Sequence, residues 1–228
     1  MLREFFVCGG YAVLEWMRSD PIGFFQFMLY RAPAVLLALI LHEIAHGYVA
    51  YRCGDPTARD AGRLSLNPLR HLSLIGTLMM FLAGVGWAKP VPVNPNNLRH
   101  GRRDDFLVSI AGITVNLILF VLFTYLAVLC SAFMWDGRFV AYNGLSKVVS
   151  YEYNAVWSVI AGSAKQDFGA VIARGWLEPF VRLFAYTALV NLNLAVFNLI
   201  PLPPLDGYHV VNDLIFKGRF QLSKNAFR

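Results

Sequence analysis

Residues 33–51 read Pro-Ala-Val-Leu-Leu-Ala-Leu-Ile-Leu-His-Glu-Ile-Ala-His-Gly-Tyr-Val-Ala-Tyr, an apolar run that carries His42, Glu43 and His46. Its length and composition predict a helix that crosses a lipid bilayer. Ionisable side chains cost about 3 kcal/mol each near the bilayer centre, so those found there usually serve a function. Two histidines four residues apart lie on one face of a helix, where their ring nitrogens can reach one metal ion.

Glu43 borders the same helix face, three residues before His46. A carboxylate at that position can take a proton from a metal-bound water molecule. The alternative interpretations are a chance match to the motif and histidines that are only buried core residues. We favour metal binding, because a His-Glu-His set in a hydrophobic helix has few structural uses.

The overall composition is that of a membrane protein. The chain has 228 residues, of which 57% are hydrophobic and 15% charged, and its mean hydropathy is +0.51. The net charge of +6 indicates basic cytoplasmic loops rather than nucleic-acid contact, and no nucleic-acid-binding motif is visible. Three cysteines without metal-ligand spacing predict no disulfide framework. We therefore expect the lipid bilayer as a partner and no nucleic acid, and the oligomeric state stays open.

Three runs are long enough to span a membrane, at residues 33–51, 106–134 and 180–200. Pro33 suits the first turn of the first helix. A shorter glycine-containing run at 72–87 predicts a re-entrant or half-membrane segment that lines a cavity. The predicted fold is an all-α polytopic membrane protein, with a core of three transmembrane helices, a re-entrant segment and a short β element near the metal site.

Residues 88–95 are the candidate for that β element. Proline alternates with valine there and cannot donate to a β ladder, so the segment is either an edge strand or a proline-rich connector. We divide the chain into an N-terminal segment 1–30 that is interfacial or weakly embedded in the membrane, a core at 31–216, and a basic C-terminal tail at 217–228.

The distribution of Lys and Arg predicts the orientation of the chain. Residues 52–71, residues 89–104 and the stretch after 206 carry four each, whereas the longer stretch 136–173 carries three. The positive-inside rule places the first three on the cytoplasmic side. His46 then lies near the cytoplasmic face, and 72–87 must enter and leave the membrane on that side.

Catalytic zinc usually takes three protein ligands and a water molecule, and His42 and His46 supply two. No glutamate follows Glu43 for more than a hundred residues. Asp206, in a proline-broken turn after the third span, is a plausible third ligand, but it could equally cap the helix that follows. His71 is also available, although its place in a basic loop favours an interfacial or hydrogen-bonding role.

The chain resembles the site-2 protease family of intramembrane zinc metalloproteases, in a compact prokaryotic branch without PDZ or CBS domains. The resemblance covers most of residues 40–210, and the HExxH and LDG motifs are specific when they occur together. It rests on six motifs, which are His42-Glu43-x-x-His46, Gly54-Asp55-Pro56-Thr57-Ala58, Gly62-Arg63-Leu64-Ser65-Leu66-Asn67-Pro68, Gly86-Trp87-Ala88-Lys89-Pro90-Val91-Pro92-Val93-Asn94-Pro95, Ala111-Gly112-x-x-x-Asn116, and Asn198-x-x-Pro201 leading to Leu205-Asp206-Gly207.

The resemblance implies one zinc ion (Zn2+) per chain, bound by His42, His46 and Asp206. It also implies that Glu43 is the general base and that Asn198 holds the substrate carbonyl or stabilises the oxyanion.

The same resemblance implies that Gly112 and Asn116 let the middle span pack closely against the helix that carries the histidines, and that residues 88–95 pair with an unwound substrate. The expected function is that of an intramembrane zinc endopeptidase in a prokaryotic cell membrane, with its active site towards the cytoplasm. Its expected substrate is a transmembrane segment of another protein. The alternatives are a membrane zinc hydrolase with a non-peptide substrate and a non-catalytic metal-binding membrane protein.

Overall fold

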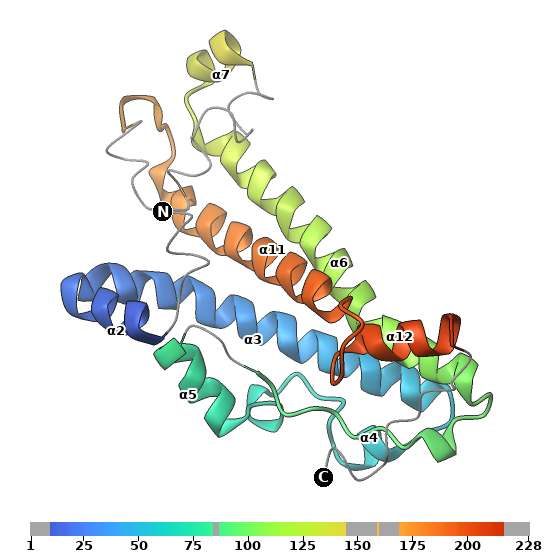
Figure 1. The fold of residues 1–228 in the computed structure, drawn as a ribbon. Helices are drawn as coiled ribbons and strands as arrows, with labels where there is room; N and C mark the ends of the chain where they lie inside the picture. Colours follow the sequence, from blue (N-terminus) through green and yellow to red (C-terminus); the bar gives the residue numbers. More distant parts are fainter. Residues whose placement is uncertain (1–9, 84–86, 145–158, 160–168, 217–228) are drawn as a thin grey trace.

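The computed structural model describes residues 10–83, 87–144, 159 and 169–216 (Figure 1). This part of the chain is mainly helical and contains no strand, only two isolated bridges that join Leu72 to Ala88 and Trp135 to Ile172. Its α-helices are α2 (Gly10–Ser19), α3 (Pro21–Arg52), α4 (Thr57–Asp60), α5 (Leu74–Ala83), α6 (Arg102–Met134), α7 (Gly137–Asn143), α11 (Glu178–Asn198) and α12 (Asp206–Leu214).

Three of these helices, α3, α6 and α11, are long and apolar enough to cross a membrane. They pack against one another, and α6 runs alongside both of the others (Figure 1). The three predicted spans are therefore confirmed, and the chain is an integral membrane protein. The short β element is not confirmed in the described residues, and the path of the re-entrant segment stays a prediction because residues 84–86 lie outside them.

The prediction that Pro33 opens the first span is wrong, because Pro33 lies inside α3. The helix begins at Pro21, where the side chain of Asp20 caps it by accepting a hydrogen bond of 2.9 Å from the amide of Gly23. In a membrane helix, neighbouring helices can pair the backbone groups that an internal proline leaves without a hydrogen bond. With 32 residues, α3 is about 48 Å long, well beyond the roughly 30 Å of a hydrocarbon core.

The segment before α3 folds back along it. Trp16 of α2 packs its ring against Phe24 and Phe27 of α3, at centroid distances of 5.8 and 5.0 Å. Residues 21–30 thus belong to the first long helix, and α2 lies beside it (Figure 1). The division into segments at 1–30, 31–216 and 217–228 stays a prediction, and the tail lies outside the described residues.

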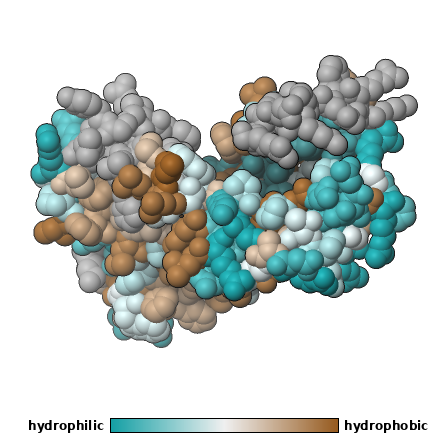
Figure 2. Space-filling model, turned by 90° about the horizontal axis from the view of Figure 1, so that it is seen from below, coloured by the Kyte–Doolittle hydropathy of each residue, from teal (hydrophilic) through white to brown (hydrophobic). Residues whose placement is uncertain are grey.

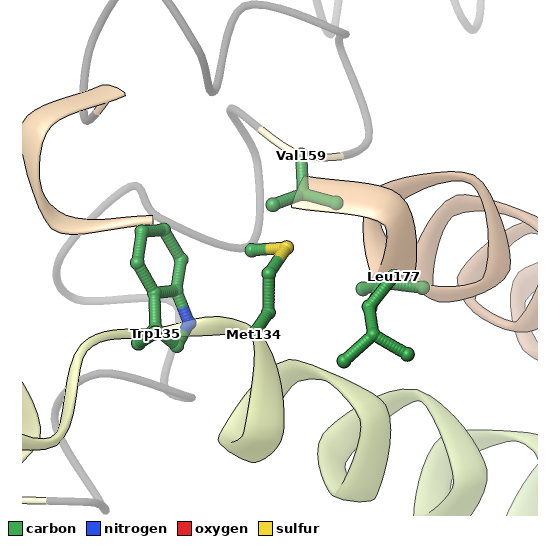
Figure 3. Packing of buried hydrophobic residues seen from close by; sticks show 5 residues of the cluster. Met134, Trp135, Val159 and Leu177 are labelled. Carbon is green, nitrogen blue, oxygen red and sulfur yellow. The ribbon is translucent and has the colours of Figure 1, made fainter. Parts of the chain in front are cut away.

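Two buried clusters fix the ends of the long helices. Met134, Trp135, Val159, Leu177 and Val181 join the end of α6 to the start of α11 (Figure 3). A second cluster, formed by Ile113, Ala195 and Val210, joins α6, α11 and α12 at the opposite end of the bundle. This second cluster places the middle of α12 beside the first half of α6.

Hydrophilic and hydrophobic surface lie mainly towards different ends of the molecule. Figure 2 shows hydrophilic surface mainly towards the end where α4 and the start of α6 lie, and hydrophobic surface over the region of α5 and the first half of α3. The hydrophilic end is the one that carries the basic segments 52–71 and 89–104.

Candidate active site

Three metal-binding side chains from two helices converge in the structure. His42 and His46 lie one turn apart on α3, and Asp206 is the first residue of α12. The Oδ2 atom of Asp206 lies 3.3 Å from the Nε2 atom of each histidine, and the two Nε2 atoms are 3.0 Å apart. Within the part of the chain that the structure describes, these three side chains form the one group that could hold a metal ion.

The separations match those around a tetrahedral metal. A zinc ion with bonds of about 2.0–2.1 Å keeps its ligand atoms about 3.3 Å apart. His46 Nδ1 lies 2.7 Å from the carbonyl oxygen of Val108, so Nδ1 carries the proton that it donates there. The Nε2 lone pair of His46 is thereby left to bind a metal. The donor set and its spacing fit a zinc ion.

The placement of Asp206 depends on a close approach between α11 and α12. The N-cap of α12 is Leu205, and no side chain makes a capping hydrogen bond there. The carboxylate of Asp206 therefore does not cap the helix, which was the alternative that the sequence left open. A Cβ atom at Gly207 would collide with the carbonyl oxygens of Leu199 and Ile200, so the close contact with the end of α11 requires glycine at this position.

The charge state of Asp206 also suits a ligand. Burial raises the pKa of this carboxyl, but its contacts with His42 and His46 outweigh burial and hold the pKa well below the ordinary value. Asp206 is therefore ionised, which is the form that binds a metal cation.

Glu43 is held by the backbone of a distant segment. Its Oε2 atom accepts a hydrogen bond of 2.7 Å from the amide of Val91. That segment is itself anchored, because the Arg63 guanidinium donates to the carbonyls of Lys89 and Pro90. The loop before α5 thus determines how the carboxylate of Glu43 is oriented beside the two histidines.

The far end of the same segment is anchored by Asp55, whose side chain is fully buried. Its carboxylate accepts hydrogen bonds from the amide of Asn94 at 2.7 Å and from the side chain of Asn97 at 2.8 Å. Burial raises the pKa of Asp55, but hydrogen bonds from Thr57, Asn94 and Asn97 outweigh burial and lower it. The GDPTA motif therefore has a structural use, which is to hold residues 94–97 in place.

Gly112 lies directly against the two histidines. A Cβ atom at this position would lie 2.7 Å from His42 Nδ1 and closer still to His46 Nε2. Gly112 is buried, and so is Asn116 one turn later on α6. The close approach that was expected at Gly112 is present in the structure.

The side chains of Asn198 and His71 donate hydrogen bonds to backbone carbonyls that are close to them in the sequence. Asn198 is the last residue of α11, and its Nδ2 atom donates to the carbonyl of Leu194 at 3.0 Å. His71 is buried, and its Nε2 atom donates to the carbonyl of Ser65 at 2.7 Å. The hydrogen-bonding role expected for His71 is present, and His71 is not part of the group around Asp206.

Residues 87–94 lie extended before the 3-10 turn at Pro95–Asn97, but they do not form a strand. Besides the hydrogen bonds from Arg63, their contacts with the loop before α5 are the Leu72–Ala88 bridge and a hydrogen bond of 2.7 Å from the amide of Lys89 to the carbonyl of His71. Sequence reasoning missed the two backbone groups that orient the site, the Val91 amide and the Val108 carbonyl. Backbone groups leave no residue-type signal, so only the fold reveals them.

The sequence comparisons agree with this geometry. The model of peptidase family M50 matches residues 30–227. The chain belongs to peptidase family M50. The resemblance to site-2 proteases is thereby confirmed, and the M50 protein is a zinc metalloprotease with zinc as its cofactor.

Several relatives carry the same type of name. The M50 protein is 36% identical over 193 residues to "Putative zinc metalloprotease YwhC" of Bacillus subtilis (strain 168), with 85% of this chain and 72% of the relative covered. It is 30% identical over 203 residues to "Putative zinc metalloprotease Rip2" of Mycolicibacterium smegmatis (strain ATCC 700084 / mc(2)155), with 86% of this chain and 62% of the relative covered. Rip2 of Mycobacterium tuberculosis (strain ATCC 25618 / H37Rv) is 26% identical over 204 residues, with the same coverage of 86% and 62%. No solved structure matches the chain at a significant level.

Proposed function

We propose that the M50 protein is an intramembrane zinc endopeptidase that hydrolyses peptide bonds in or near transmembrane segments of other membrane proteins, as in regulated intramembrane proteolysis. The observation that carries this proposal is the convergence of Asp206 from α12 with His42 and His46, which lie, with Glu43 beside them, on a helix of membrane-spanning length. A metalloprotease whose metal ligands lie in such a helix meets its substrates at the membrane.

In this proposal His42, His46 and Asp206 hold the zinc ion. Zinc, when bound, polarises the scissile carbonyl and lowers the pKa of a bound water molecule. Glu43 takes the proton of the attacking water and passes it to the leaving amine. The hydrogen bond from Val91 keeps the Glu43 carboxylate in one orientation during this transfer. Asn198, once its amide turns from the Leu194 carbonyl, donates to the substrate carbonyl or to the oxyanion.

The segment that contacts Glu43 also borders the cleft that we propose for the substrate. An open cavity of about 450 Å³ lies between residues 72–75 and residues 87–90. Leu74, Ile75 and Trp87 are exposed there. An extended substrate backbone lying beside residues 88–95, in the manner of strand addition, would reach the site along this apolar surface.

The proposed chemistry requires local unwinding of the substrate. A transmembrane helix hides its carbonyl groups in backbone hydrogen bonds, so attack on one of them requires that the helix open. Substrates with Gly, Pro or Asn in the span are therefore expected to be favoured, because these residues weaken helices. Equal cleavage rates for a helix-stabilised substrate and for one with these residues would show that unwinding does not limit the reaction.

We further propose that the active site faces the cytoplasm. The basic segments 52–71 and 89–104 lie at the same end of the bundle as the last turns of α3. His46 is six residues before the end of α3 at Arg52, about 9 Å along the helix axis. Water can then reach the site from the cytoplasmic side.

The test is cleavage of a single-span reporter protein in proteoliposomes that contain the purified M50 protein. We expect the wild type to cut within or near the span, and we expect Glu43→Gln to retain zinc but lose cleavage. Hydrolysis of lipid or small esters without peptide cleavage would indicate a zinc hydrolase with a non-peptide substrate. Zinc binding with neither activity would indicate a non-catalytic metal-binding protein.

A further inference from the structure

Asn116 is a polar residue in the middle of a membrane helix, and no hydrogen-bonding role has been assigned to its side chain. It lies on α6 and is fully buried. Neither its Nδ2 donor nor its Oδ1 acceptor has a hydrogen-bond partner in the structure. Burying such groups without partners costs free energy, and a native protein normally pairs them directly or through an ordered water molecule.

Among the buried polar atoms that have no hydrogen-bond partner in the structure and lie on the helices that flank α6, two can be linked to Asn116. One is the Nδ1 atom of His42 on α3, and the other is the Oδ1 atom of Asn191 on α11. Asn191 is also fully buried, and its Nδ2 atom donates to the carbonyl of Thr187 at 2.8 Å. When His42 binds zinc through Nε2, its Nδ1 atom carries a proton and is a donor.

The packing of α3 against α6 brings His42 level with Asn116. Ala50 of α3 and Val108 of α6 share one buried cluster. His42 lies two helical turns before Ala50, and Asn116 lies two turns after Val108. Because the two helices run in opposite directions, His42 and Asn116 lie at the same level of the bundle. Gly112 lies between these levels and contacts His42, and side chains one turn apart on a helix have Cβ atoms about 5–6 Å from each other.

The packing of α6 against α11 brings Asn116 level with Asn191. Ile113 of α6 packs with Ala195 of α11 in one cluster. Farther along the same helices, the rings of Phe123 and Phe184 have their centroids 5.8 Å apart. Asn116 is three residues beyond Ile113, and Asn191 is one turn before Ala195, so the antiparallel register places the two amides opposite each other.

We propose that Asn116 is a positioning residue of the zinc site, whose Oδ1 atom accepts a hydrogen bond from His42 Nδ1 and whose Nδ2 atom donates to Asn191 Oδ1. Each link is direct or passes through one ordered water molecule. Every donor without a partner among these atoms is matched by an acceptor, and the series ends at the Thr187 carbonyl. The inference rests on the proposed role of His42 as a zinc ligand.

We call these linked side chains, His42, Asn116 and Asn191, the relay. The relay gives the Nδ1 atom of His42 a hydrogen-bond acceptor, as the Val108 carbonyl does for the Nδ1 atom of His46. A fixed partner at Nδ1 selects the tautomer that presents Nε2 to the metal and holds the ring in place. Because the relay crosses from α3 to α11, it also makes zinc affinity depend on the packing of the third span. Loss of such a partner typically weakens metal affinity by about 10–100-fold.

The test measures zinc affinity of the full-length protein in detergent, by competition with a chelator, together with thermal unfolding of the metal-free protein. We expect Asn116→Leu and Asn191→Leu to weaken zinc binding, by about 10–100-fold for Asn116→Leu, without lowering the melting temperature of the metal-free protein. Asn116→Asp keeps an acceptor for His42, so we expect it to bind zinc more tightly than Asn116→Leu does and with an affinity close to that of the wild type. Ser131→Ala, another buried polar change on α6 but near its far end, is the control and should leave zinc affinity unchanged.

Wild-type zinc affinity in Asn116→Leu would overturn the relay. Equal losses in Asn116→Asp and Asn116→Leu would do so as well, even if the leucine variant folds poorly, because the acceptor would then make no difference. A wild-type protein that binds no zinc would overturn the metal site itself. The failure of the relay is therefore distinguishable from the failure of the proposed function.

Discussion

The carboxylate of Glu43 and the backbone amide of Val91 are joined by a hydrogen bond of 2.7 Å, although 48 residues separate them in the sequence. Glu43 lies on the helix that carries the two histidines, and Val91 lies in the extended segment after α5. The segment therefore contacts the proposed base directly, in addition to any contact that it makes with substrate. Changes in this segment should affect turnover without removing a metal ligand.

Val91→Pro tests this relationship, because proline removes the amide proton and leaves an extended backbone possible. Glu43 then loses a hydrogen bond to its charged carboxylate. We expect kcat to fall about tenfold, equivalent to about 1.4 kcal/mol, while zinc content stays that of the wild type. Peptide cleavage and zinc analysis on the same preparation measure both.

Val93→Pro is the matched control for that experiment. Val93 also follows a proline, and in the described residues its amide makes no hydrogen bond. We expect near wild-type kcat for this variant. Equal losses in both variants would mean that the general rigidity of the segment matters and that the bond to Glu43 does not.

Gly112→Ala should disrupt the metal site without touching a ligand. The added methyl group would overlap the positions of both histidine rings, so one ring or the whole of α6 must move. We expect zinc affinity to fall by at least tenfold, because ligand geometry is set within tenths of an ångström. Gly137→Ala, where a Cβ meets nothing within 4 Å, is the control. Unchanged zinc affinity in Gly112→Ala would contradict the close packing of α6 on the site.

Asp213→Asn should stabilise the protein in a pH-dependent way. Burial and the neighbouring charge of Asp105 raise the pKa of Asp213 to about 6, against the lowering effect of His209 and Arg102. A raised carboxyl pKa means that folding favours the protonated form, so stability falls as pH rises from about 4 through 6. At pH 7.5 we expect the asparagine variant to be more stable by about 1 kcal/mol, allowing for solvent screening.

The measurement is the melting temperature at pH 5 and pH 7.5. We expect a rise of about 2–4 °C at pH 7.5 and about half of that rise at pH 5, because at pH 5 the unfolded state is already ionised at this position while folded Asp213 is still largely protonated. Asp60→Asn, which changes an exposed carboxylate paired with Arg59, should show no such gain. A gain of the same size at both pH values would show that charge on Asp213 is not the cause.

The three spans were predictable because hydrophobic length alone identifies them, but their boundaries were not. Pro33 has the signal of a helix start because proline suits the first turn, but Pro21 carries the same signal together with the N-cap Asp20, and the helix begins there. A proline inside α3 depends on packing that the local sequence does not encode.

The pair His42 and His46 could be predicted from helical spacing alone. Asp206 could not, since its approach to the histidines depends on how α12 packs against α6 and on the contact at Gly207. The residues alone left two roles open for Asp206, metal ligand and helix cap, and the family resemblance favoured the metal ligand. The partners of Glu43 and His46 are backbone groups, which no residue pattern identifies.

The most direct measurement is the number of zinc ions per purified protein for the wild type, His46→Ala, Asp206→Ala and Glu43→Gln. We expect about one zinc ion in the wild type and in Glu43→Gln, and loss of zinc in the other two variants, because a catalytic zinc site uses three protein ligands. Full zinc content in Asp206→Ala would contradict the convergence of His42, His46 and Asp206 on one metal ion, and with it the proposed active site.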